Sequence, residues 1–570
     1  MEMPTDLEIA RSVELAPIEE IAWTRGIGVE ELVPFGRHMA KVTWPAIRSR
    51  IQQPRGSLIL VTSVNPTRYG EGKTVTTIGL SIGLNRIGKK AACVIREPSM
   101  GPVFGIKGGA AGGGHVQVLP MEDINLHFTG DIHAVTSAHN LCSAVLDNHL
   151  HQGNELNLDP SRILWPRVLD MNDRTLRSAA IGLGGPANGM AREERFDITA
   201  ASEVMAILAL ARDYEDLRFR LGEIVIGPSR DGRPIKANDI EAAGAMALLM
   251  RTAFLPNLVQ TTEGTPAFIH AGPFANIAHG NSSIIADRLS LALNDMVVTE
   301  AGFGADLGAE KALHIKAQAS GISPDCIVVN VTVRSMKMHG YGMSGITMTG
   351  DRLKEENLDM LRLGATANLG RHIRNMARFG PDVVVSINRF PTDTDVEIET
   401  LMQIATDAGS AETVLYEGHA KGGEGAEPLA HAVNRAVQRH MAAGRPFNPL
   451  FDADAPIEEK VQTIAMEIYG ASGIEIETRA QKQLKQIIEW GYGELPVCMA
   501  KTQYSFSHDP NLHGAPDGFT LPIREFRLNA GAGFIVAVCG SMMTMPGLPR
   551  RPAAADMDMD EDGNLTGVFS

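Results

Sequence analysis

A lysine and a threonine end a glycine-containing loop in the first part of the chain. The loop reads N-P-T-R-Y-G-E-G-K-T over 65–74, after an apolar run over 58–64 and before a helical stretch that ends at Arg86. Strand, loop and helix follow one another as in a nucleotide phosphate loop, whose backbone amides point at the phosphates. Lys73 would reach the outer phosphates and the Thr74 hydroxyl would bind Mg²⁺. The predicted phosphate-binding residues are Thr67, Gly70, Glu71, Gly72, Lys73 and Thr74.

This loop departs from the strict pattern at its first position. The consensus G-x-x-x-x-G-K-[ST] has a glycine where this chain has Thr67. The alternative interpretation is an ordinary strand-to-helix turn that binds no ligand. Because a strand precedes the loop and a helix follows it, the phosphate loop is the favoured interpretation.

An arginine follows the next apolar run, over 91–95. Ligands collect at the carboxyl ends of parallel strands, so Arg96 is predicted to lie in the same crevice as Lys73. A planar guanidinium suits a carboxylate or an acyl phosphate, and a surface salt bridge is the alternative. Six of the ten residues from Gly105 to Gly114 are glycine, which either lets the backbone approach a ligand or leaves it mobile.

Short apolar runs alternate with stretches of helical length along most of the chain. Because most runs are apolar at consecutive positions, they predict strands buried on both faces, and the order predicts an α/β fold with a mainly parallel sheet. One helix is predicted over 200–221. The predicted strands are 58–64, 91–95, 223–226, 296–299, 326–333, 383–387, 497–499 and 534–539.

Composition excludes several classes of protein. At about 150 residues per domain, 570 residues indicate roughly three or four domains. The chain has 52 Lys and Arg against 67 Asp and Glu, a net charge of −15, which argues against a general nucleic-acid binder. Five scattered cysteines favour a reducing cytoplasm. The start lacks a secretory signal, and the uncharged stretch 528–549 contains glycines and a proline, so no membrane segment is expected.

Three further patterns carry weaker signals. The G-x-G-x-x-G at 340–345 is separated from its strand and opens no helix, so a dinucleotide site is not supported. The acidic tail at 558–563 lacks the final glutamate of a calcium loop. A metal site is a minor alternative to ordinary polar histidines in one group, which consists of Asp123, His127, Asp131, His133, His139, His149 and His151.

Several long blocks resemble the formate–tetrahydrofolate ligase family. They extend from about residue 17 to the end of the chain, which makes the resemblance far more specific than the loop alone. The blocks are NPT and GEGKT within 65–74, REPSMGPVFGIKGGAAGGG at 96–114, PMEDINLHFTGDIHAVTSAHN at 120–140, GGPANG at 184–189, TPAFIHAGPFANIAHG at 265–280, VTEAGFGADLGAEK at 298–311, FPTDT at 390–394, AKGGEG at 420–425, AKTQYSFS at 500–507 and MTMPGLPRRPAA at 543–554.

This resemblance implies an enzyme that joins formate to tetrahydrofolate with ATP and Mg²⁺, through formyl phosphate, and that a monovalent cation (K⁺ or NH₄⁺) activates. It implies a homotetramer whose largest domain has a P-loop nucleotide-hydrolase fold, accompanied by two further α/β domains. The expected division is 1–152 with 258–365 for the nucleotide and formyl phosphate domain, 153–257 for the second, and 366–570 for the third, which contributes the folate site. Small molecules, rather than a nucleic acid or a membrane, are the expected partners.

It also implies roles for individual residues. Lys73 and Arg96 would be catalytic, and Arg96 would hold formyl phosphate together with Gly105, Gly108 and Gly109. Folate would contact Phe390, His419, Glu97 and Asp131.

Departures from the family pattern concern mainly the folate site. His419 stands where the family usually has a tryptophan that stacks on the folate rings, and an imidazole offers less apolar area. Within the loop, Arg68, Tyr69 and Val75 differ from the usual residues, and the segment 341–351 is longer than usual. These departures leave open another pterin or amine as the formyl acceptor. A third hypothesis is a P-loop ATPase that acts as a conformational switch.

Overall fold

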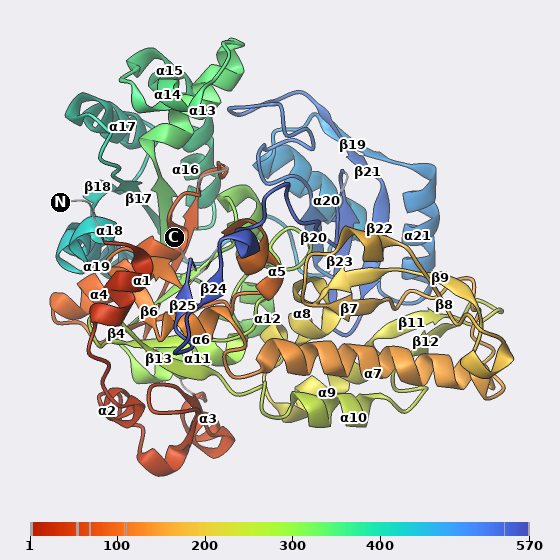
Figure 1. Ribbon diagram of the computed structural model, residues 1–570. Coiled ribbons are helices and arrows are strands. Elements are labelled where there is room, and N and C mark those ends of the chain that lie inside the picture. Colours follow the sequence, from red (N-terminus) through yellow and green to blue (C-terminus); the bar gives the residue numbers. More distant parts are fainter. Residues whose placement is uncertain are drawn as a thin grey trace.

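The structure is a computed structural model that describes residues 4–52, 56–67, 70–107, 109, 111–540 and 542–567 (Figure 1). Its centre is a mixed, mostly parallel sheet. Among the described residues this sheet has twelve strands, ten of them in the order β1-β2-β13-β14-β4-β15-β3-β16-β17-β18, with β6 beside β13 and β5 beside β6. The α/β class predicted from the apolar runs is confirmed.

The strands of this sheet are β1 (Leu32–Pro34), β2 (Ala40–Val42), β3 (Ser57–Ser63), β4 (Ala91–Ile95), β5 (Gly112–Gly113), β6 (Val116–Leu119), β13 (Asn257–Thr261), β14 (Pro266–Ile269), β15 (Met296–Glu300), β16 (Cys326–Val331), β17 (Asp382–Asn388) and β18 (Glu412–Tyr416). Neighbouring strands from β14 to β18 are parallel. The pairs on the β1 side of β14 are antiparallel.

Helices cover both faces of the parallel part, which explains why its strands are apolar at consecutive positions. On one face, Ile59 and Val61 of β3 pack with Leu80 of α4 and Val433 of α19. On the other face, Leu60 packs in a cluster with residues of η7, α13 and α16. These elements are α4 (Lys73–Arg86), α19 (Glu427–Ala443), η7 (Ala312–Lys316), α13 (Val333–Ser344) and α16 (Gly370–Ala377).

A smaller sheet near the carboxyl end packs on the second of these faces. Its order is β20-β23-β22, and β19 pairs with β21 beside it. Met499 of β20 and Ile535 of β23 belong to the same apolar cluster as Leu60. The elements are β19 (Gly473–Ile476), β20 (Val497–Ala500), β21 (Thr520–Ile523), β22 (Glu525–Asn529), β23 (Phe534–Val538), α20 (Ile457–Thr463) and α21 (Thr478–Glu489).

The middle of the chain packs on the main sheet as a layer of helices and short strands (Figure 1). Its elements are α7 (Asp131–His151), β7 (Arg167–Leu169), β10 (Phe196–Ile198), α8 (Glu203–Leu210), α9 (Tyr214–Glu223), β11 (Val225–Pro228), β12 (Pro234–Lys236) and α10 (Ala243–Met250). The structure corrects one prediction here, because two helices replace the single helix over 200–221. Asp213 caps the second helix by accepting from the Asp216 N–H, and Ala211 is extended.

Other sequence predictions can be compared directly. The G-x-G-x-x-G at 340–345 lies at the end of α13, and Gly345 terminates that helix in the left-handed conformation. The strand predicted at 534–539 corresponds to β23. Within the described residues, no helix is long and apolar enough to cross a membrane.

Candidate functional site

The predicted loop joins the carboxyl end of β3 to the start of α4. Gly72 precedes the helix with φ of 72°, and Gly70 has φ of 77°, so both adopt the left-handed conformation that favours glycine. A Cβ at Gly72 would lie 2.3 Å from Nδ2 of Asn388, at the end of β17. This close approach leaves no room for a side chain. Arg68 and Tyr69 lie outside the described residues.

Two of the predicted loop residues shape the loop from within. The Thr67 N–H donates to Glu71 Oε1 at 2.7 Å, and the hydroxyl of Thr332 donates to Glu71 Oε2 at 2.8 Å. The Glu71 carbonyl accepts from the side-chain amide of Asn330. Burial raises the pKa of the Glu71 carboxyl. Glu71 therefore holds the loop to the carboxyl end of β16.

The first two residues of α4 face the carboxyl ends of β3 and β15. Lys73 Nζ lies 3.4 Å from the hydroxyl of Ser63, and the Thr74 hydroxyl donates to Glu300 Oε2 at 2.8 Å. Glu300 is the last residue of β15 and is only 4% exposed. The start of the helix thus brings a cation, a hydroxyl and a carboxylate to one edge of the sheet.

Arg96 reaches the same carboxylate from β4. Its Nε and Nη2 each lie 3.4 Å from Glu300 Oε1, and Nη1 donates to the carbonyl of Pro273 at 3.3 Å. Its guanidinium remains partly exposed, at 23%. Arg96 and Thr74 therefore meet at Glu300, as expected for the ends of neighbouring parallel strands. Sequence reasoning missed Glu300, although it is an acid that ends an apolar run of this sheet.

The glycine-rich segment contacts other parts of the protein at both ends. A Cβ at Gly105 would lie 2.6 Å from the side chain of Asn172, and one at Gly114 would lie 2.1 Å from the carbonyl of His419. Gly109 follows η2 (Val103–Lys107) in irregular structure. Gly108, which was predicted beside formyl phosphate, lies outside the described residues. Close backbone packing accounts for the glycines at 105 and 114.

Phe390 and His419 follow neighbouring parallel strands. Asn388 of β17 pairs with Tyr416 of β18, which brings the residues after them to the same edge of the sheet. The Phe390 ring centroid lies 4.4 Å from the guanidinium carbon of Arg334. His419 is exposed in α18 (Gly418–Lys421), and its carbonyl accepts from the His115 N–H at 3.0 Å. Both aromatic residues therefore lie beyond the strand ends, on the β18 side of the loop.

Glu97 and Asp131 are buried behind the strand ends. Asp131 Oδ2 pairs with Lys41 Nζ at 2.8 Å and accepts from Asn257 at 2.8 Å. Burial and the nearby Asp131 carboxylate hold the pKa of Glu97 well above its usual range. Oε2 of Glu97 is buried and makes no hydrogen bond to any described residue. This acidic cluster is separate from the Arg96 guanidinium, although Glu97 is the next residue.

Among the described residues, no three or more His, Cys, Asp or Glu side chains are grouped to hold a metal ion. His139 is buried, with Nδ1 at 2.7 Å from the Ser202 hydroxyl and Nε2 at 2.8 Å from the Pro166 carbonyl. Its ring stacks on Trp165 at 3.9 Å. Burial lowers its pKa to about 3, so His139 is a neutral polar side chain with its hydrogen bonds satisfied.

A large cavity lies away from the phosphate loop. It measures about 1060 Å³ and is lined by segments around 161–166, α21 and β22. Three of the four arginines that line it are paired with acids that also line it, as in Arg527–Glu525 at 3.2 Å and Arg195–Asp197 at 3.5 Å. The polar groups convergent on Glu300 identify the strand edge, rather than this cavity, as the candidate site.

Comparison with known proteins identifies the family of this chain. A family model described as formate–tetrahydrofolate ligase matches residues 4–569. Proteins named formate–tetrahydrofolate ligase from Paracoccus denitrificans (strain Pd 1222) and Maricaulis maris (strain MCS10) are each 54% identical over 567 residues, covering 100% of both chains. One of the same name from Methylobacterium nodulans is 54% identical over 569 residues. The chain that brings Lys73, Thr74, Arg96 and Glu300 together therefore belongs to the formate–tetrahydrofolate ligase family.

Proposed function

We propose that this chain activates formate with ATP as formyl phosphate and transfers the formyl group to tetrahydrofolate. The observation that carries the proposal is the meeting of Thr74 and Arg96 at Glu300, beside the start of α4. At this edge the backbone amides of α4 and the ammonium of Lys73 can bind phosphates, and the guanidinium of Arg96 can bind a carboxylate. Both anions of the first step would then bind at one edge of the sheet.

The phosphate loop is the proposed ATP site. The amides at the start of α4 and the ammonium of Lys73 would stabilise the negative charge that shifts between the transferred phosphoryl group and ADP. The Thr74 hydroxyl and the Glu300 carboxylate are oxygen donors of the kind that Mg²⁺ prefers, and they lie 2.8 Å apart. Magnesium bound there would add positive charge near the phosphates.

Arg96 is the proposed formate and formyl phosphate ligand. A formate oxygen attacks the γ-phosphorus of ATP, the bond from phosphorus to the ADP oxygen breaks, and ADP leaves. Formate alone is a poor acyl donor because its oxygen leaves badly, and phosphorylation supplies a better leaving group. The planar guanidinium would hold the carboxylate in line with the phosphate. The glycine-rich segment, with Gly105, Gly108 and Gly109, is proposed to adjoin it.

Folate is proposed to bind beyond β17 and β18. Its pterin would pack between Phe390 and His419, and its arylamine nitrogen would attack the formyl carbon while phosphate leaves. The amine proton then passes to solvent. Glu97 follows β4, and Asp131 bonds to Lys41 of β2 and Asn257 of β13, so both lie on the other side of the phosphate loop from β17 and β18. Their contact with folate stays a prediction from the family resemblance. The product is 10-formyltetrahydrofolate.

Monovalent-cation activation is part of the proposal. The expected ion is K⁺ or NH₄⁺. Among the described residues, no group of three or more His, Cys, Asp or Glu side chains is placed to hold a metal ion, so the proposal assigns no ligand to it.

A P-loop fold, three domains and a homotetramer complete the proposal. The division implied by the family resemblance is 1–152 with 258–365, then 153–257, and then 366–570. Because β17, β18 and α19 pack in the main sheet layer, we draw the central part beyond residue 365, to Ala443. The third part then begins after α19 and contains the smaller sheet.

The decisive test is ADP release by the purified full-length chain with ATP, Mg²⁺, formate and tetrahydrofolate. Release that requires both formate and tetrahydrofolate is the expected result. Release with formate and another reduced pterin, while tetrahydrofolate is inert, would favour the alternative acceptor that His419 suggests. Formate-independent hydrolysis stimulated by a protein would instead favour an ATPase switch.

Replacing His419 by tryptophan is expected to lower the KM for tetrahydrofolate by about three- to tenfold. An indole presents a larger apolar face to the pterin than an imidazole does, and a good aromatic pair contributes about 0.5–1.5 kcal/mol. The measurement is the KM for tetrahydrofolate at saturating ATP and formate. His431→Trp, at an exposed position of α19, is the matched control. A higher KM in His419→Trp would contradict the stacking arrangement.

A further inference from the structure

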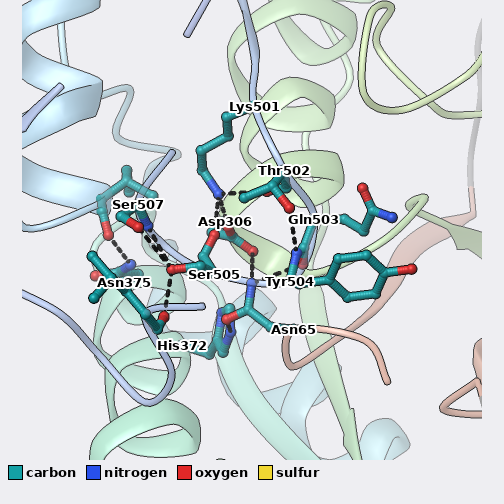
Figure 2. Close-up of polar contacts among 12 residues, drawn as sticks. Asn65, Asp306, His372, Asn375, Lys501, Thr502, Gln503, Tyr504, Ser505 and Ser507 are labelled. Atoms are coloured by element: carbon teal, nitrogen blue, oxygen red, sulfur yellow. Dashed lines mark hydrogen bonds and ion pairs between the residues drawn. The ribbon is translucent and has the colours of Figure 1, made fainter. Parts of the chain in front are cut away.

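Asn65, the second residue after β3, makes four side-chain hydrogen bonds (Figure 2). Its Nδ2 donates to Asp306 Oδ1 at 3.1 Å and to the Gln503 carbonyl at 3.2 Å. Its Oδ1 accepts from Asn368 Nδ2 at 2.9 Å and from His372 Nε2 at 3.1 Å. Both donor hydrogens and both acceptor positions of the amide are therefore used, which fixes its orientation. Asn65 anchors the phosphate loop to three other segments.

A buried ion pair holds the partners of Asn65 in place. Lys501 Nζ lies 2.6 Å from Asp306 Oδ2, and both side chains are 0% exposed. The same ammonium donates to the Ser505 carbonyl at 2.5 Å and to the Thr502 carbonyl at 3.2 Å, and it lies 4.7 Å from the Tyr469 ring centroid. Lys501 therefore orients the Asp306 carboxylate. It also holds the segment 501–505 in a turn around its ammonium, and this turn fixes the position of the Gln503 carbonyl that Asn65 contacts.

This network joins the two strand ends that supply the candidate site. Asn65 stands between β3 and Lys73, and Asp306 lies in η6 (Ala305–Ala309), which the turn at 301–304 joins to Glu300 of β15. The turn is tightly packed, because a Cβ at Gly304 would lie 2.5 Å from Asp306 Oδ1 and 3.4 Å from the Asn65 Cα. A shift of Asp306 would therefore move the phosphate loop relative to Glu300.

The ionisable groups near the Lys501–Asp306 pair leave its two charges balanced against each other. His372 packs on the Phe506 ring at 4.5 Å, and burial lowers its pKa to about 4, so it is neutral at pH 7. Lys311 and Glu310 also lie in this buried region, the latter bonded to His314 at 2.7 Å. The ammonium of Lys501 directly balances the carboxylate of Asp306.

We propose that the Lys501–Asp306 pair is a positioning device for the phosphate loop, acting through Asn65 to set the ATP phosphates against Glu300 and Arg96. The inference rests on the proposed ATP-dependent function. A merely structural pair would stabilise the fold without affecting the affinity for ATP. A positioning pair would affect the affinity for ATP even when fold stability is restored, because loop amides that no longer face the phosphates lose their hydrogen bonds to them.

The test separates these two roles with a double variant. Lys501→Met alone leaves the Asp306 carboxylate buried without its partner, so a lower melting temperature is expected. Lys501→Met with Asp306→Leu removes both charges and is expected to recover most of that stability. It is nevertheless expected to bind MgATP about 10- to 100-fold more weakly, by calorimetric titration, because Asn65 has lost its carboxylate partner.

Control variants test whether removing any buried ion pair weakens MgATP binding. Lys316 and Asp287 form another buried pair, with 2.5 Å between Nζ and Oδ2. Lys316→Met with Asp287→Leu is expected to leave the Kd for MgATP within about twofold of that of the unsubstituted chain. Asn65→Asp, which places a second carboxylate beside Asp306, is expected to weaken MgATP binding as the first double variant does.

Two results would overturn the inference. One is a Lys501→Met/Asp306→Leu protein with unchanged affinity for MgATP, and the other is an equal loss in the Lys316 and Asp287 control. Direct binding is measured, so the outcome is independent of whether formate or folate reacts. Failure of the ligase proposal would instead appear as unsubstituted protein that binds MgATP but releases no ADP with formate and tetrahydrofolate.

Discussion

Lys73→Ala is expected to lower kcat for formate- and tetrahydrofolate-dependent ADP release by about 10³-fold. The ammonium lies at the start of α4, near Ser63 and at the edge where Thr74 meets Glu300. Phosphoryl transfer depends mainly on positioning and on positive charge at the phosphates, and removal of one preorganised donor typically costs about 10²–10³-fold. The measurement is initial-rate ADP release at saturating substrates.

Lys90→Ala is the matched control for this variant. Lys90 is exposed and precedes β4, so it lies at the opposite edge of the sheet from the phosphate loop. We expect its turnover to match that of the unsubstituted chain. Retention of more than a tenth of the normal kcat by Lys73→Ala would contradict the assignment of Lys73 to the phosphates.

Much of the fold could be predicted because its signals are local. The run 91–95 coincides with β4, and β3, β15, β16 and β17 lie within a residue or two of the predicted strands. Strands covered on both faces must be apolar at consecutive positions, so their sequences differ clearly from amphipathic helices. The prediction of a single helix over 200–221 was wrong because apolar residues at helical spacing continue through the region. Their pattern does not indicate the break at Ala211 or the helix cap at Asp213.

The candidate site could be predicted in part for the same reason. The loop and α4 are contiguous, and the rule for parallel strands was enough to bring Arg96 to the same edge. Glu300 and Asn388 were missed, because each is one polar residue at the end of an apolar run. Their importance depends on neighbours across the sheet. A single sequence does not reveal which strands are adjacent.

The Lys501–Asp306 pair is the extreme case of a long-range contact. The two residues are 195 positions apart, and Asn65 is 241 positions from Asp306. Each lies in a block of the family resemblance, yet no spacing within a block indicates the contact. Buried charges require partners, but the sequence alone does not identify the partner.

Arg96→Ala is expected to lower kcat/KM for formate by about 10³-fold while MgATP affinity changes less than about threefold. The Arg96 side chain is partly exposed and contacts the buried Glu300 carboxylate. Its removal takes away the bidentate donor for formate and leaves a negative charge facing an incoming anion. Lys73 and the loop amides remain, so ATP binding is retained. The two measurements are kcat/KM for formate from initial rates and the Kd for MgATP from calorimetric titration.

Two companion variants sharpen this prediction. Arg96→Lys keeps a positive charge but replaces a planar fork by a point charge, so we expect a loss of about 10²-fold in kcat/KM for formate. Arg435→Ala removes an exposed arginine that pairs with Glu412 at the amino end of β18, and no loss is expected. An equal loss of MgATP affinity in Arg96→Ala would mean that Arg96 serves the nucleotide. A selective loss for formate would instead place the carboxylate substrate beside the guanidinium, near the phosphate that Lys73 is proposed to bind.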